Sequence, residues 1–127
     1  MSDILVAMTT PPSITVDYTV LDCPEPAELA RFYSTILGWD PVGDDGDWVV
    51  IHGAGELRLA FQRAPEFTPI DWPSEGIKIH LDLVVDDLEQ ARDFVVDAGA
   101  TLIDNTHSSF WVYRDPVGHI FCLCKRT

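Results

Sequence analysis

His80 and Asp82 are the residues of this chain whose types and spacing are best suited to chemistry. Residues two apart on a β-strand point to the same face of the sheet. A carboxylate beside an imidazole raises the imidazole pKa and helps to fix its tautomer, which makes a general acid–base pair. The alternative is that His80 only hydrogen-bonds a neighbouring residue.

Further polar side chains are predicted to share this surface. Tyr18 or Arg58 could polarise a carbonyl oxygen, and Arg58 and Gln62 could bind a carboxylate or an amide of a ligand. The alternatives for Arg58 and Gln62 are a solvated rim and a cross-strand hydrogen bond. Cys122 and Cys124 could act as nucleophiles only as activated thiolates, and otherwise they are small buried apolar residues.

Tryptophan residues offer flat apolar surfaces to a ligand. Trp48 and Trp111 lie on opposite parities of their predicted strands, so only one of them should face a cavity. Trp72 lies in a linker, where it could form a lid or a dimer contact. Several residues near turns are interpreted as surface positions without a chemical role: His52, His107, His119, Glu56 and Asp115.

The elements that must position these side chains occur twice. The second half of the chain repeats the first at a constant offset of 62 residues, so that Phe32 corresponds to Phe94 and Val50 to Val112. A gapless repeat of this length indicates two copies of one supersecondary unit, which pair to bury their apolar faces. The concavity between the two copies is the expected place for a ligand.

Each copy is predicted to be a βαβββ module, which gives an α+β fold with two curved mixed sheets around a cup and helices on the convex face. The first module, residues 14–63, should contain a helix from Pro26 to Gly38 and strands near 14–22, 48–51 and 57–62. The second, residues 77–125, should contain a helix over 87–98 and strands near 77–85, 101–104, 109–114 and 119–125. A proline-rich linker, 64–76, joins the modules, and residues 1–13 read as a tail.

The composition excludes several classes of partner. The formal net charge of −13 argues against nucleic acid, because binding phosphates requires clustered Lys and Arg. No apolar run approaches the roughly 20 residues that span a membrane, and the N-terminus lacks a signal-peptide pattern. Three cysteines do not make an even disulfide framework, so reduced thiols in the cytoplasm are expected.

Three segments carry a family resemblance: residues 21–33 (LDCPEPAELARFY), 37–39 (LGW) and 113–119 (YRDPVGH). With the module pattern, they resemble the glyoxalase I, bleomycin-resistance and extradiol dioxygenase group, the vicinal oxygen chelate superfamily, over residues 14–125. The resemblance implies paired βαβββ modules, usually in a homodimer, and a metal-centred cup in the enzymes of the group.

The resemblance also implies where metal ligands would lie in this chain, namely at Tyr18, Ala60, His80 and Cys122. The usual ligands are His, Gln and Glu, and of these four positions only His80 keeps one. A catalytic zinc ion normally has three protein ligands, and one imidazole with one thiol falls short of that number. No metal or other cofactor is therefore expected, which argues against lactoylglutathione lyase and dioxygenase activity.

Two functional hypotheses follow. In the first, the chain binds a small organic molecule in the cup without chemistry, as the resemblance to bleomycin-resistance proteins implies, and it does so as a homodimer. In the alternative, it is a metal-independent isomerase or lyase with His80 and Asp82 as the acid–base pair. Function must be argued from the site, because the fold alone fixes neither hypothesis.

Overall fold

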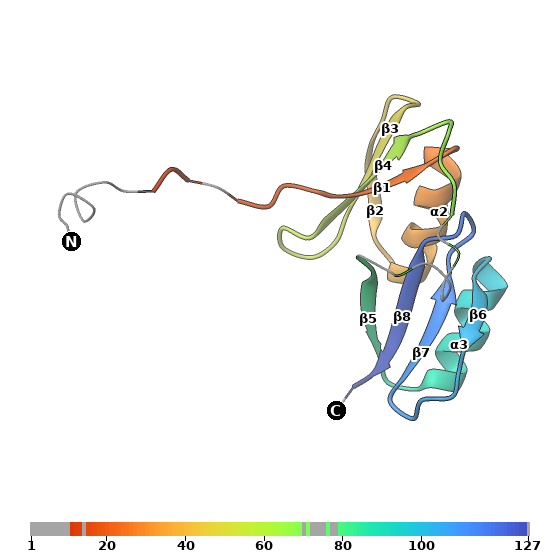
Figure 1. Ribbon diagram of the computed structural model, residues 1–127. Helices are drawn as coiled ribbons and strands as arrows, with labels where there is room; N and C mark the ends of the chain where they lie inside the picture. The colour runs from red at the N-terminus through yellow and green to blue at the C-terminus, as the bar shows by residue number, and fades with distance from the viewer. Residues whose placement is uncertain (1–10, 14, 70, 72–75, 77–78, 127) are drawn as a thin grey trace.

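The computed structural model describes residues 11–13, 15–69, 71, 76 and 79–126, and in them two modules of one helix and four strands each (Figure 1). The first module contains β1 (Thr19–Cys23), α2 (Pro26–Leu37), β2 (Asp40–Asp44), β3 (Trp48–His52) and β4 (Arg58–Arg63). The second contains β5 (Leu81–Val85), α3 (Leu88–Ala98), β6 (Thr101–Asp104), β7 (Phe110–Arg114) and β8 (Ile120–Lys125).

Both sheets have the same topology. The strand order is β1-β4-β3-β2 in one sheet and β5-β8-β7-β6 in the other. β1 runs parallel to β4, and β5 runs parallel to β8, whereas the other pairs are antiparallel. The pair Thr19–Leu59 of the first sheet corresponds to Leu81–Phe121 of the second, at the offset of 62 residues seen in the sequence. The predicted α+β fold of two βαβββ modules is confirmed.

The sequence pattern missed one strand and misplaced the start of two others. β2 has the sequence DPVGD and all five of its residues are exposed, so it lacks apolar alternation and contains a single β-forming residue, Val42. It pairs with β3 at the sheet edge through a register shift between Pro41 and Gly43, where a missing ladder donor is tolerated. β1 begins at Thr19 rather than near residue 14, and β5 begins at Leu81 rather than near residue 77.

Local signals define where the two helices begin and end. Pro26 starts α2, where its missing N–H is not needed, and Gly38 ends the helix with a positive φ of 69°. The Asp87 side chain caps α3 by accepting hydrogen bonds from the backbone N–H groups of Glu89 and Gln90. No helix in the described ranges is long and apolar enough to cross a membrane.

Both helices lie on the same side of the two sheets (Figure 1), and the core between them and the sheets is continuous across both modules. Phe32 and Tyr33 of α2 contact Phe121 of β8, with ring centroids 6.1 and 6.3 Å apart. A second, smaller apolar cluster lies on the opposite face of the second sheet and contains Val112, Ile120 and Cys122. The helices therefore cover one face of each sheet and leave the other for a site.

Asp115 connects the modules, and its interpretation as a surface turn residue is wrong. It is 3% exposed. Its Oδ2 accepts a hydrogen bond from the Tyr33 hydroxyl of the first module at 2.8 Å, and its Oδ1 accepts from the backbone N–H groups of residues 117–119 at 2.9–3.0 Å. Burial and the Asp115 carboxylate raise the pKa of Tyr33, so the hydroxyl remains a donor. A buried carboxylate is stable here because hydrogen-bond donors surround it.

Removing this connection is expected to destabilise the chain in graded steps. Asp115→Ala leaves several buried donors without a partner and should lower the free energy of unfolding by about 3 kcal/mol. Tyr33→Phe removes one of these donors and should cost about 1–2 kcal/mol. Urea denaturation followed by circular dichroism measures both values.

Tyr113→Phe is the matched control for Tyr33→Phe. Tyr113 is also fully buried, but its hydroxyl has no hydrogen-bond partner among the described residues. Its removal should change the free energy of unfolding by less than about 0.5 kcal/mol, because no hydrogen bond is lost. Equal losses for the two tyrosine variants would contradict the role assigned to Asp115.

Candidate functional site

A cavity of about 480 Å³ lies where the two modules meet. One side of its wall is formed by residues 18–22 with Tyr33 and Phe67, and the other by residues 79–81 with His119 and Ile120. Half of these side chains are apolar, and the other half include two imidazoles, two phenols and the Asp22 carboxylate. An apolar hollow with a few convergent polar groups is the usual form of a small-molecule site.

His80 reaches this cavity from the residue before β5, and Asp82 lies next to it. The His80 Nε2 and Asp82 Oδ1 atoms are 3.0 Å apart, with 41% and 61% of the two side chains exposed. The predicted pair is therefore in hydrogen-bond contact, and only His80 faces the hollow. This arrangement can orient the ring and support proton transfer at the mouth of the cavity.

Cys122 joins this pair from the neighbouring strand. Asp82 and Cys122 are register partners on β5 and β8, and ligand atoms of His80, Asp82 and Cys122 all lie within 4.8 Å of one another. Burial, and next the Asp82 carboxylate, raise the pKa of the Cys122 thiol to about 11. The same causes raise the pKa of Cys124. Near neutral pH the thiols are protonated and lack the thiolate that nucleophilic attack requires.

The first module contributes a self-contained polar cluster. The Arg58 guanidinium contacts Asp17 at 2.8 Å and lies over the Tyr18 ring, 4.9 Å from its centroid. Tyr18 meets Trp48 edge to face at 5.4 Å. The charge of Arg58 is thus already matched by a carboxylate, which weakens its suitability for binding a ligand carboxylate. Tyr18 is the one member that lines the cavity between the modules.

The remaining predicted site residues that the structure describes lie apart from that cavity. Trp48 lines a second hollow of about 480 Å³, on the first sheet only, together with Tyr18 and His52. Gln62 is opposite Trp48 on β4, exposed, and contributes to neither hollow. Trp72 lies outside the described residues. Trp111 packs against the core on the helix side.

His119 is a site residue that the sequence interpretation missed. It was expected to be exposed, but its side chain is 18% exposed and lines the cavity, and its Nδ1 atom lies 2.8 Å from Asp115 Oδ2. The signal available in the sequence was the turn from Asp115 to His119, which places an imidazole four residues after a carboxylate. That spacing alone does not reveal that both side chains are buried.

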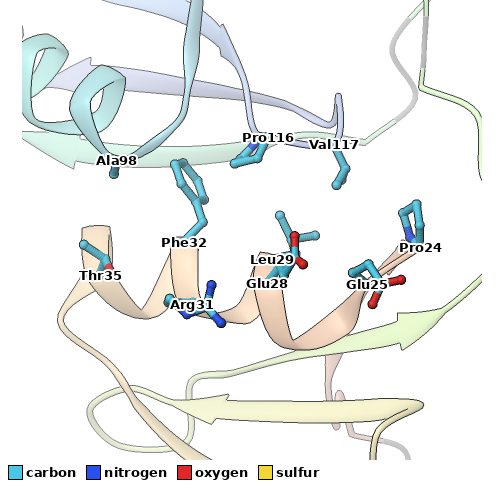
Figure 2. Close-up of a pocket in the computed structure, with 10 residues that line it drawn as sticks. All are labelled: Pro24, Glu25, Glu28, Leu29, Arg31, Phe32, Thr35, Ala98, Pro116 and Val117. Atoms are coloured by element: carbon cyan, nitrogen blue, oxygen red, sulfur yellow. The ribbon is translucent and has the colours of Figure 1, made fainter.

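A separate groove lies on the helix side of the molecule. It has a volume of about 330 Å³ and runs between α2 and the turn that joins β7 to β8 (Figure 2). Glu25, Glu28 and Arg31 supply its charged groups, opposite Pro116 and Val117. It contains no imidazole or thiol, so the candidate site is the cavity between the modules.

Comparison with known proteins assigns the family. The family model described as a glyoxalase-like domain matches residues 18–124. The chain belongs to the glyoxalase-like domain family. A sequence comparison with curated proteins finds no match.

Solved structures support the same fold for this glyoxalase-like chain. It resembles a glyoxalase/bleomycin resistance protein/dioxygenase family enzyme from Burkholderia phytofirmans PsJN, at 18% identity over 86% of this chain and 96% of the other, with a TM-score of 0.71. A glyoxalase-related enzyme from Fulvimarina pelagi matches at 20% identity over 88% of each chain, with a TM-score of 0.65. A glyoxalase/bleomycin resistance protein from Albidiferax ferrireducens T118 matches at 13% identity over 88% and 98%, with a TM-score of 0.61. At these identities the likeness concerns the fold.

The four family positions for metal ligands do not fit a hard divalent ion in this glyoxalase-like chain. Ala60 offers no donor and is fully buried, and Tyr18 packs against Trp48 and Arg58. A softer ion such as Zn²⁺ finds three donors in His80, Asp82 and Cys122, but it would have to displace the proton of a thiol with a pKa of about 11.

The purified glyoxalase-like chain is therefore expected to contain well under one equivalent of zinc, nickel or iron, because its donors are protonated or paired with one another. Elemental analysis after dialysis against metal-free buffer measures this. One tightly bound equivalent that disappears in Cys122→Ser, while Cys23→Ser retains it, would contradict the expectation. Cys23 is a buried cysteine of the first module and serves as the matched control.

Proposed function

We propose that this glyoxalase-like protein binds a small organic molecule in the cavity between its modules and holds it without a divalent metal. The observation that carries the proposal is the cavity of about 480 Å³, whose apolar lining residues are joined by polar ones, among them Tyr18, His80 and His119. The apolar wall favours burial of a ligand body, and the three polar groups can fix its orientation.

The charge of the chain bears on the class of ligand. With a formal net charge of −13, the protein repels anions at long range and attracts cations. Asp22 lies in the cavity wall, and Asp82 lies beside His80 at its mouth. The names of similar structures include bleomycin resistance protein, and sequestration of a cationic or neutral organic molecule is the corresponding role proposed for this chain.

Blocking the cavity should abolish binding. Val20 lines the cavity and is 41% exposed, so Val20→Trp can fill the hollow without disturbing the core. For a compound that raises the melting temperature of the wild type, selected from cationic glycopeptides and small 2-oxo compounds, Val20→Trp should weaken binding by at least about tenfold. Isothermal titration calorimetry measures the affinity.

Val96→Trp provides the control for this variant. Val96 is 42% exposed and lies on α3, away from the lining of the cavity, so the same substitution should leave the affinity within about twofold. Undiminished binding to Val20→Trp would place the ligand elsewhere, and the groove along α2 would then be the next site to test.

A second candidate function rests on the contact between His80 and Asp82. Their 3.0 Å separation, with His80 at the cavity wall, supports a metal-independent isomerase or lyase that acts on a small 2-oxo compound. His80 would take and return a proton, and Asp82 would orient the imidazole. Tyr18 would donate a hydrogen bond to a carbonyl oxygen.

If this second function holds, His80→Gln should lower kcat by roughly 10²–10⁴-fold, as expected for loss of a general acid or base. Steady-state assays with the 2-oxo compounds that bind would measure the loss. His107→Gln is the matched control, because His107 also lies near a carboxylate, Asp104, at 3.7 Å, but outside the cavity. Turnover that survives His80→Gln would eliminate the enzymatic alternative and leave the binding function.

A second copy of the chain is part of the proposed function. β1 and β5 each form one edge of their sheet, and Val20 and Val84 on them are 41% and 57% exposed. Free strand edges with apolar side chains are surfaces that another copy can cover. A homodimer formed there would close the open side of the cavity.

A further inference from the structure

His119 is held in one orientation by Asp115. The Asp115 carboxylate accepts a hydrogen bond from the Tyr33 hydroxyl and from the backbone N–H groups of residues 117–119, and the His119 Nδ1 atom lies 2.8 Å from the same carboxylate. Burial and the Asp115 carboxylate raise the pKa of Tyr33 and keep its hydroxyl protonated. Apart from His119, all of these partners of the carboxylate are therefore donors. An ionised carboxylate only accepts hydrogen bonds, and the hydrogen in the contact with His119 therefore belongs to Nδ1.

The second nitrogen of the same ring is left without a partner. His119 Nε2 is buried and makes no hydrogen bond with any described residue. When Nδ1 of a neutral imidazole carries the hydrogen, Nε2 presents a lone pair and can only accept. Unpaired buried polar atoms are uncommon in folded proteins, and each of them calls for an explanation.

The position of the ring suggests what supplies the missing donor. The His119 ring forms part of the wall of the cavity between the modules, beside Ile120 and on the same side as His80. Phe67 packs against the imidazole, with ring centroids 4.9 Å apart, and contributes an apolar surface to the same wall. A ligand with a flat or apolar body could contact Phe67 and Ile120 and bring a donor to Nε2.

We infer that His119 is a ligand-binding residue that accepts a hydrogen bond through Nε2, and that Asp115 is the residue that positions it. The ligand class that this selects is a compound with an apolar body and a hydroxyl or N–H donor. This inference rests on the proposed function, because that function gives the cavity a binding role. His119 is not one of the four positions, 18, 60, 80 and 122, at which the family resemblance places site residues.

The tautomer of His119 gives the first test. Long-range ¹H–¹⁵N correlation spectra of the full chain, labelled with ¹⁵N-histidine, distinguish protonated from unprotonated ring nitrogens. The expected spectrum at pH 8 shows His119 with hydrogen on Nδ1 and none on Nε2. A hydrogen on Nε2 would overturn the inference, because that atom would then be a donor.

A matched pair of probes gives the second test. 4-Methylphenol and 4-methylanisole share an aromatic body, but only the phenol has a hydroxyl donor. The phenol should bind the wild type about tenfold more tightly, the order of magnitude of one hydrogen bond to a buried acceptor, and it should shift the Nε2 resonance. In His119→Asn this preference should vanish, because the Asn amide can replace Nδ1 as the donor to Asp115 but has no counterpart of Nε2.

The outcomes separate this inference from the proposed function. Both probes could shift the resonances of the cavity-lining residues equally, and His119→Asn could bind them like the wild type. The inference about His119 would then be wrong, while the cavity would remain a binding site. If neither probe binds, the proposed function and the inference fail together. His52→Asn is the control variant, because His52 lines the separate hollow on the first sheet, and it should keep the preference for the phenol.

Discussion

The rest of the structure depends on the hydrogen bonds that the buried carboxylate of Asp115 accepts. It accepts hydrogen bonds from the hairpin turn that contains it and from Tyr33, which lies 82 residues earlier in the chain. Gly118, in the same turn, has a positive φ of 109°, and a side chain there would collide with Pro69. One carboxylate thus fixes a turn, a helix of the other module and the His119 ring, because a buried charge requires all of its donors to stay in place.

The two modules share a backbone but differ in chemistry. On the first sheet, Arg58 pairs with Asp17 and lies over the Tyr18 ring, so its charge is already matched within the chain. On the second sheet, His80 and Asp82 lie beside the thiol of Cys122. The duplication has therefore preserved the register of the strands while the exposed faces diverged. The cavity lies at the boundary between the modules, where both sheets contribute to its wall.

Much of the fold was predictable, because periodicity and repetition are properties of the local sequence. Alternation along the predicted strands 77–85 and 119–125 placed His80, Asp82 and Cys122 on one face, and the structure brings their ligand atoms within 4.8 Å of one another. Alternation did not predict β2, since an exposed edge strand that contains Pro and Gly lacks both the pattern and the composition of a strand. Nor could it show that Arg58 is paired with Asp17, a residue that precedes the first strand.

The sequence by itself determined the duplication, the helix ends and the faces of the strands, because each of these depends on residues close together in the chain or on a constant offset between two copies. Only the tertiary structure decided that Asp115 is buried and that His119 lines a cavity. Turn chemistry predicts the same Asp-Pro-Val-Gly sequence whether the turn faces solvent or another module. The contact with Tyr33 across 82 residues makes the difference, and no local pattern encodes it.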